Sequence, residues 1–267
     1  MGDDPAAPPR LERLAATTGP ARVLRPLIGG ASLVEADGRA FVAKVGPGAR
    51  DEADGLERLA GVPGGPPVPG VVLTDGELIV TTWVEQGPRT DRHEEALGRD
   101  LATLHRAPFE HWGGGSSWVG ACRVDPGPHP DGASFYGSRL MSLAARCGLE
   151  TSVARVAARL PALLPPGGPA VVHGDLWWGN VLSGVDERSW LIDPSVHGGH
   201  PEEDLAMLAL FGAVPRRLRA AYDEVHRLDD GWQERVELFQ LYPLLVHAVL
   251  FGGAYGARAE VVARRFG

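Results

Sequence analysis

The chain has 267 residues, of which 44% are hydrophobic and 22% are charged, and its formal net charge is −8. This length allows one large domain or two lobes, and the composition is ordinary for a globular protein. The acidic balance gives no electrostatic footprint for nucleic acid or an anionic membrane, and no hydrophobic run reaches the roughly 18 residues of a transmembrane helix.

We expect a cytoplasmic protein. The first residues lack the basic start and the hydrophobic core of a signal peptide. The two cysteines, Cys122 and Cys147, are too few for a disulfide framework and have no metal-binding spacing. The negative charge is compatible with a cationic or amine-bearing small substrate.

The first 84 residues predict a small antiparallel sheet. After a short helix over Leu11–Thr17, apolar runs alternate with turn residues such as Asp37-Gly38, a strong hairpin signal. A turn such as Gly29-Gly30-Ala31-Ser32 can present backbone N–H groups to phosphates, although an ordinary hairpin turn is an equal alternative. We expect strands over residues 23–28, 33–36, 40–45, 71–73 and 78–84.

Lys44 lies on the third of these strands, and Glu52 begins an expected helix over residues 52–59. A strand lysine that pairs with a helix glutamate and reaches the α- and β-phosphates is the positioning device of kinase-like folds. The alternative is an edge-strand charge and a glutamate favoured by the helix dipole, and these residues alone leave both open.

From residue 85 the pattern changes to helices, beginning with Glu94–His105, which has leucines at helical spacing. Residues 108–132 form a Gly/Pro-rich segment long enough to be a lid or binding loop, whose Trp112 and Trp118 either stack on a ligand or pack the loop onto the protein. Further helices are expected over residues 135–146, 152–164, 202–211, 215–226, 233–251 and 254–266, the second kinked or stopped near Pro161.

The strongest functional pattern is the stretch from Ala170 to Leu182, followed by Trp190–Pro194. Short apolar runs flank Asp175, Asn180 and Asp193. Phosphoryl transfer to a hydroxyl needs a carboxylate that accepts the hydroxyl proton, and an amide oxygen and a second carboxylate that hold magnesium. The alternative is a solvated loop between two core strands, and the preceding His-Gly pair and the strand before Asp193 favour catalysis.

The full motif is His173-Gly174-Asp175-Leu176-Trp177-Trp178-Gly179-Asn180, followed by Asp193-Pro194 and by Gly199-His200-Pro201-Glu202-Glu203-Asp204-Leu205-Ala206-Met207. It resembles the signature of the fructosamine kinase (ketosamine 3-kinase) family, in the aminoglycoside-phosphotransferase branch of the protein-kinase-like fold. The similarity extends from about Ile28 to Phe266. It implies an α+β bilobal fold, with a small antiparallel β lobe and one main helix in residues 1–84 and a larger, mainly helical lobe in residues 85–267.

The resemblance also implies roles for individual residues. Asp175 is then the base that orients and deprotonates the substrate hydroxyl. Asn180 and Asp193 bind magnesium, while Lys44 holds the phosphates of ATP and Glu52 fixes Lys44. Further nucleotide-binding residues are Gly29, Gly30 and Ser32, with Thr82, Trp83 and Val84 at the adenine hinge. Further substrate-binding residues are Trp178, His197 and Trp232, and the supporting residues are His173, Asp204 and His247.

The chain departs from the family pattern in its middle loop, Gly115–Gly120, and in the Asp125-Pro126-Gly127 that follows. The family has an Asp-Asn pair before an Ile-Gly at this place and a Gln-x-Asn after it. We expect this segment to face the acceptor, so the departure leaves the sugar specificity open. The acid common at the hinge is replaced by Thr82.

The first functional hypothesis is an ATP- and Mg²⁺-dependent kinase that transfers the γ-phosphate to the O3′ hydroxyl of a ketoamine, a fructosamine or ribulosamine. A second keeps the fold and takes an aminoglycoside or other amino sugar as acceptor. A third is a non-catalytic nucleotide-binding regulator, which the presence of Asp175 disfavours because such a protein needs no base. The expected partner is a small amine-bearing sugar or glycated amine, without nucleic acid or membrane, and a monomer is favoured.

Overall fold

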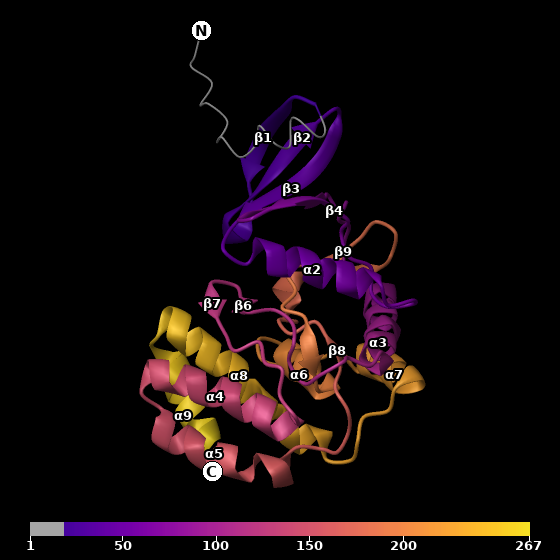
Figure 1. Cartoon of the computed structure of the whole chain (residues 1–267). Coiled ribbons are helices and arrows are strands. Elements are labelled where there is room, and N and C mark those ends of the chain that lie inside the picture. The colour runs from indigo at the N-terminus through magenta and orange to yellow at the C-terminus, as the bar shows by residue number, and fades with distance from the viewer. Residues whose placement is uncertain (1–18) are drawn as a thin grey trace.

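The computed structural model describes residues 19–267, and the helix expected over Leu11–Thr17 lies outside them. A five-stranded antiparallel sheet forms the N-terminal lobe, in the order β1-β2-β3-β5-β4 (Figure 1). Asp37 and Gly38 both adopt positive φ, as the tight turn between β2 and β3 requires. The strands are β1 (Ala21–Pro26), β2 (Ala31–Ala36), β3 (Arg39–Val45), β4 (Val71–Asp75) and β5 (Leu78–Thr82).

Helix α2 (Ala49–Ala60) lies between the sheet and the helical lobe (Figure 1). Its buried Ala49, Ala53 and Leu56 form a small cluster with Ile79 of β5. The helix is therefore packed on the sheet by one face, and it carries Glu52 to the junction of the two lobes.

The C-terminal lobe is mainly helical, as expected. It consists of α3 (Asp91–Arg106), α4 (Gly132–Cys147), α5 (Glu150–Leu163), α6 (Pro201–Leu208), α7 (Arg216–Val225), α8 (Trp232–Phe251) and α9 (Ala254–Phe266). Helix α5 continues past Pro161 to Leu163. The α+β, bilobal prediction is confirmed. Because β5 ends at Thr82 and α3 begins at Asp91, we retain residues 1–84 and 85–267 as the proposed division of the chain.

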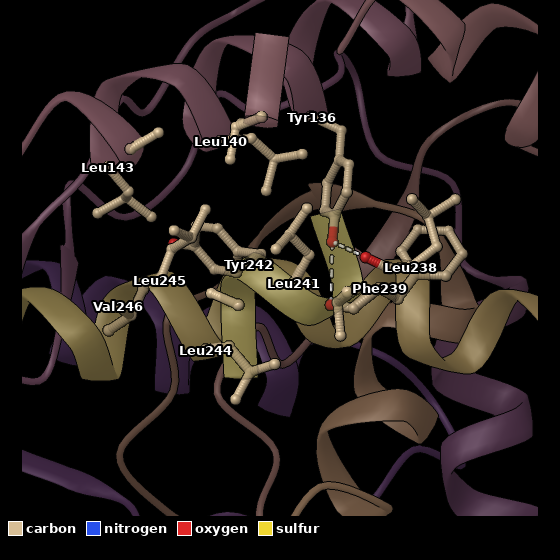
Figure 2. Close-up of a cluster of buried hydrophobic side chains, with 14 of the residues drawn as sticks. Tyr136, Leu140, Leu143, Leu238, Phe239, Leu241, Tyr242, Leu244, Leu245 and Val246 are labelled. Carbon is tan, nitrogen blue, oxygen red and sulfur yellow. Dashed lines mark hydrogen bonds between the residues drawn. The ribbon is translucent and has the colours of Figure 1, made fainter. Parts of the chain in front are cut away.

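Helix α8 passes through the core of this lobe and contains Pro243, which has no N–H to donate to the carbonyl of Phe239 four residues earlier. The Tyr136 hydroxyl, from α4, donates to that carbonyl at 2.9 Å and to the Leu238 carbonyl at 3.0 Å (Figure 2). Tyr136 is almost fully buried among leucines of α4 and α8. It thereby supplies the hydrogen bond that the proline removes.

Short strands frame the segment between α5 and α6. Strand β8 (Ala170–Val172) pairs with β11 (His197–Gly199), and β9 (Val181–Ser183) pairs with β10 (Ser189–Leu191). A further pair, β6 (Trp118–Val119) and β7 (Cys122–Arg123), lies in the long loop after α3. The β8–β11 and β9–β10 pairs bring residues 173–180 next to residues 192–196. Among the described residues, none of the helices combines the length and hydropathy that crossing a bilayer requires.

Candidate active site

An ion-pair triad joins the two lobes. The Lys44 ammonium, on β3, lies 2.8 Å from a carboxylate oxygen of Glu52 on α2 and 3.1 Å from one of Asp193. Burial lowers the pKa of Lys44, but the charges of Asp193 and Glu52 outweigh burial and raise that pKa above its ordinary value. The ammonium is therefore protonated at neutral pH and available to a phosphate.

Asp175 follows β8 in the central loop. Asn180, in the short 3-10 turn Trp178–Asn180, donates through Nδ2 to the backbone carbonyl of Asp175 at 2.8 Å and to its carboxylate at 3.3 Å. Burial raises the pKa of the Asp175 carboxyl to about 7, and the charge of Asp193 adds to the shift. A carboxylate with a pKa near neutrality is well suited to accept a proton from a hydroxyl.

Asp204 of α6 holds the backbone of this loop. Its two carboxylate oxygens accept from the N–H groups of His173 at 2.7 Å and Gly174 at 2.9 Å. Gly174 has φ of 80°, and a Cβ there would lie 2.1 Å from the Ser195 carbonyl oxygen, so only glycine fits. His173 Nε2 donates to the carbonyl of Ile192 at 3.0 Å, which ties the loop to the residue before Asp193.

Asp193 itself has φ of 52°, a left-handed conformation that is uncommon for a residue other than glycine. The neighbours on both sides are bonded to His173. Its Nε2 donates to the Ile192 carbonyl, and the Ser195 N–H donates to the His173 carbonyl at 2.8 Å. Strain of this kind is concentrated at functional sites. Here it accompanies the Asp193 carboxylate that reaches Lys44.

An aromatic row runs from this loop to the C-terminal helices. Trp177 contacts Phe211 edge to face, with ring centroids 6.2 Å apart, and His247 of α8 lies 5.2 Å from Phe211 and 4.9 Å from Tyr255. Trp177 is 40% exposed and Phe211 is 42% exposed. His247 also lines, with Asp175, a small pocket beside the loop. The row therefore presents apolar rings to solvent next to the expected base.

The family model for fructosamine kinase matches residues 44–266 of the chain. The chain belongs to the fructosamine kinase family. The "Probable ketoamine kinase TTHA1179" of Thermus thermophilus is 37% identical over 212 residues, which cover 77% of this chain and 78% of that protein. A crystal structure of a fructosamine-3-kinase homologue from Thermobifida fusca is 35% identical, with a TM-score of 0.83 and coverage of 95% of this chain and 96% of the other.

The wider fold is that of the aminoglycoside phosphotransferases. The structure of APH(2″)-IIa with streptomycin and ATP is 16% identical, with a TM-score of 0.66 over 100% of this chain and 99% of that one. A likeness at this identity shows the fold alone. Together with the family match, it establishes a kinase of the fructosamine kinase family on a protein-kinase-like fold.

The expected nucleotide-binding residues lie at both ends of the sheet: the Gly29-Gly30 turn is beside the end of β3 that carries Lys44, and the hinge is beside the beginning of β3. Gly29 and Gly30 form the turn between β1 and β2, both with positive φ, and Ala31 after them pairs with Lys44. Ser32 follows on β2. At the hinge, the Thr82 N–H donates to the Gly70 carbonyl, and the Trp83 N–H donates to the Ala40 carbonyl. Within the described residues, the Val84 N–H makes no such backbone hydrogen bond.

Three expected substrate residues do not line the pocket that contains Asp175. Trp178 packs under the Arg89 guanidinium, 3.8 Å from its ring centroid, and Trp232 packs in the same way under Arg219. Trp232 begins α8, about four turns from His247. His197 is 2% exposed and receives a hydrogen bond from Arg139 at 2.9 Å, beneath Gly174. We therefore replace all three in the proposed acceptor site.

Trp177, which is not among the residues expected from the sequence, is the more exposed of the two adjacent tryptophans beside Asp175. Its ring covers Gly179, where a Cβ would lie 2.1 Å from the ring. The glycine two residues later is thus the signal that distinguishes the two tryptophans, because only a residue without a side chain leaves room for the ring.

The middle loop has two kinds of contact. Val119 lines the pocket with Asp175, whereas Gly115–Trp118 contact α2 and the segment after Asp193. That this segment faces the acceptor stays a prediction. Trp112 packs on Gly132 and Trp118 on Gly48, so both tryptophans hold the loop against the protein. Of the two alternatives given for Trp112 and Trp118, the structure favours packing of the loop onto the protein over stacking on a ligand.

Proposed function

We propose that this protein transfers the γ-phosphate of Mg²⁺-ATP to a sugar hydroxyl of a ketoamine, a fructosamine or ribulosamine. The observation that carries the proposal is the triad of Lys44 with Glu52 and Asp193, placed beside Asp175 in a chain of the fructosamine kinase family. The triad offers a cation for the nucleotide phosphates, and the adjoining loop offers a base for the acceptor.

Asn180 and Asp193 fit a magnesium ion by their chemistry. Mg²⁺ prefers oxygen ligands and completes its shell with water and phosphate oxygens, so one amide and one carboxylate suffice as protein ligands. The Asn180 Nδ2 donates its hydrogen bonds to Asp175, so the side-chain amide oxygen remains available as a metal ligand. The ion would neutralise charge on the phosphates.

The protein's own contribution is positioning and proton transfer. Lys44 would bind the α- and β-phosphates while Glu52 keeps its ammonium in place, and the turn at Gly29-Gly30 would cover the phosphates with N–H groups. The acceptor hydroxyl would donate its hydrogen bond to Asp175, which takes the proton as the oxygen attacks in line. No covalent phosphoryl-enzyme is needed.

The aromatic row would contact the acceptor. Trp177 is exposed two residues after Asp175, and the half-buried His247 lines the pocket with Asp175. Their rings offer faces on which a sugar ring or the carbon chain of a glycated amine can lie. These contacts do not depend on the group attached to the amine. The row is therefore compatible with a free ketoamine and with a ketoamine attached to a protein. We keep the cytoplasmic location and the monomer as predictions.

The decisive experiment supplies Mg²⁺-ATP with a fructosamine, a ribulosamine and an aminoglycoside in parallel, measures ADP release and locates the new phosphate by NMR. We expect phosphorylation of a ketoamine, and Asp175→Asn should lower turnover by about a thousandfold or more while ATP still binds. Phosphorylation of the aminoglycoside alone would transfer the function to the second hypothesis. Full turnover by Asp175→Asn would remove Asp175 from its proposed role.

A further inference from the structure

The loop Gly115–Trp118, here called the bridging loop, is bonded to helix α2 through Asp51. One carboxylate oxygen of Asp51 accepts from the Ser117 N–H at 2.6 Å. The Ser116 hydroxyl lies 3.3 Å from the same oxygen, and its shorter bond, at 2.8 Å, is to the Trp118 carbonyl within the loop. Asp51 and these serines lie more than sixty positions apart in the chain. The contact therefore joins the helix of the N-terminal lobe to a loop of the C-terminal lobe.

On its other side the bridging loop is bonded to the segment that follows Asp193. The Ser116 N–H donates to the Val196 carbonyl at 2.8 Å, and the Ser195 hydroxyl donates to the Trp118 carbonyl at 2.8 Å. A Cβ on Gly115 would lie 1.9 Å from the Val196 oxygen, so the two backbones touch. The bridging loop is therefore fixed to the segment that follows Asp193.

Asp51 immediately precedes Glu52, whose carboxylate fixes Lys44. A cavity of about 320 Å³, lined by Gly55, Arg58 and Val196 among others, separates part of α2 from the lower lobe. Beyond the cavity, Leu59 of α2 packs in the core of the lower lobe, and Gly55 lies close against Pro194 and Val196. The Asp51 contacts add polar bonds at the end of the helix that carries Glu52. A second polar contact of α2 with the lower lobe, Arg58 with Glu110, is an exposed ion pair of the kind that contributes little. A short hydrogen bond from a backbone N–H to a carboxylate is stronger.

We propose that Asp51 is a positioning residue for phosphoryl transfer. By bonding the bridging loop, it fixes α2 relative to the Asp193 segment and so keeps Glu52 and Lys44 aligned with Asp193 for the nucleotide phosphates. Asp51 acts through Glu52 and touches no substrate. The inference rests on the phosphate-binding role proposed for Lys44 and Glu52, but not on the identity of the acceptor.

A purely structural role predicts a different result. Asp51 lies in the first turn of α2, where a carboxylate also favours the helix through its dipole. Loss of that effect alone would lower the melting temperature and the fraction of active enzyme, and it would leave Kd and KM unchanged. A change in ATP affinity therefore separates positioning from stability.

The test measures Mg²⁺-ATP binding by calorimetry without acceptor, together with kcat and both KM values. We expect Asp51→Ala to raise Kd and KM for ATP about tenfold and to lower kcat, with the acceptor KM unchanged. Asp51→Asn keeps an oxygen that can accept from Ser117, and it should restore most of the affinity. Asp54→Ala, one turn away and paired only with exposed Arg50, is the matched control and should bind ATP normally.

Two further variants make the result decisive. Ser116→Ala removes the long hydroxyl contact to Asp51 together with the bonds of this hydroxyl to Trp118, which shape the bridging loop. It should change ATP binding in the same direction as Asp51→Ala, by a smaller factor. In a Glu52→Gln background, Asp51→Ala should have little additional effect, because both act through one ion pair. Normal ATP affinity in Asp51→Ala, or equal effects with and without Glu52, overturns the proposal. Because binding is measured without acceptor, a failure to phosphorylate ketoamines would count against the proposed function alone.

Discussion

Adjacent tryptophans in the central loop have opposite surroundings. Trp177 is exposed beside Asp175, whereas Trp178 is packed among core residues under Arg89. We expect Trp177→Ala to raise the acceptor KM about tenfold through the loss of ring contact, with ATP affinity and melting temperature nearly unchanged. Steady-state kinetics with both substrates varied measures this effect.

Trp178→Ala serves as the matched control for this prediction. It should lower the melting temperature by opening a cavity near Leu176 and Val181, with a normal acceptor KM for the remaining folded enzyme. The opposite pattern, an acceptor effect from Trp178 and none from Trp177, would contradict the assignment made from their surroundings.

The sequence predicted which polar groups lie together better than it predicted the surroundings of the tryptophans. Asp175, Asn180 and Asp193 lie in one stretch of chain, so their spacing predicted a shared site, and Lys44 pairs with Glu52 as expected. The direction of a tryptophan side chain depends on residues distant in sequence, such as Arg89 for Trp178 and Phe211 for Trp177. Residue type alone carries no such information.

Helix α8 combines a proline with a buried donor on the neighbouring helix. Because the Phe239 carbonyl has lost its helical partner at Pro243, Tyr136→Phe would leave this carbonyl buried and unpaired. We expect a loss of about 1–3 kcal/mol in the free energy of unfolding, measured by chemical denaturation.

Tyr255→Phe is the control for this change. The Tyr255 ring packs on His247, and its hydroxyl forms no hydrogen bond with the described residues, so the substitution should leave stability within about 0.5 kcal/mol of the parent. Equal stability of Tyr136→Phe and the parent would show that the helix tolerates the unpaired carbonyl.

The long elements followed from the sequence with their approximate bounds, whereas for the short strands around the central loop the sequence predicted their presence but not their pairing. The periodicity of α3, α8 and α9 and the turn at Asp37-Gly38 predicted those elements because each pattern is local. Strands β8 and β11 have three residues each, and they exist only because they pair with one another. The bonds of the bridging loop to Asp51 were likewise outside what the sequence could predict, since they span the two lobes and leave no periodic signal.

At the scale of the whole molecule, the nucleotide phosphates would meet groups from both lobes, Lys44 from the sheet and Asp193 from the helical lobe. Ligand that binds only the folded protein stabilises it by about 2.7 kcal/mol at a hundred times Kd. At roughly 2–4 °C per kcal/mol for a chain of this size, saturating Mg²⁺-ATP should raise the melting temperature by about 5–10 °C.

The magnesium-dependent part of this shift should require Asp193. Thermal unfolding of the parent with ATP and Mg²⁺, compared with ATP and EDTA, isolates that part. We expect Asp193→Asn to lose it, because the amide presents one neutral oxygen where the metal favours a carboxylate. Asp54→Asn, an exposed acidic residue on α2, removes the same charge elsewhere and should keep the full shift. If the magnesium-dependent shift in Asp193→Asn were as large as in the parent, the metal would be bound by other ligands. The main role of Asp193 would then be its ion pair with Lys44.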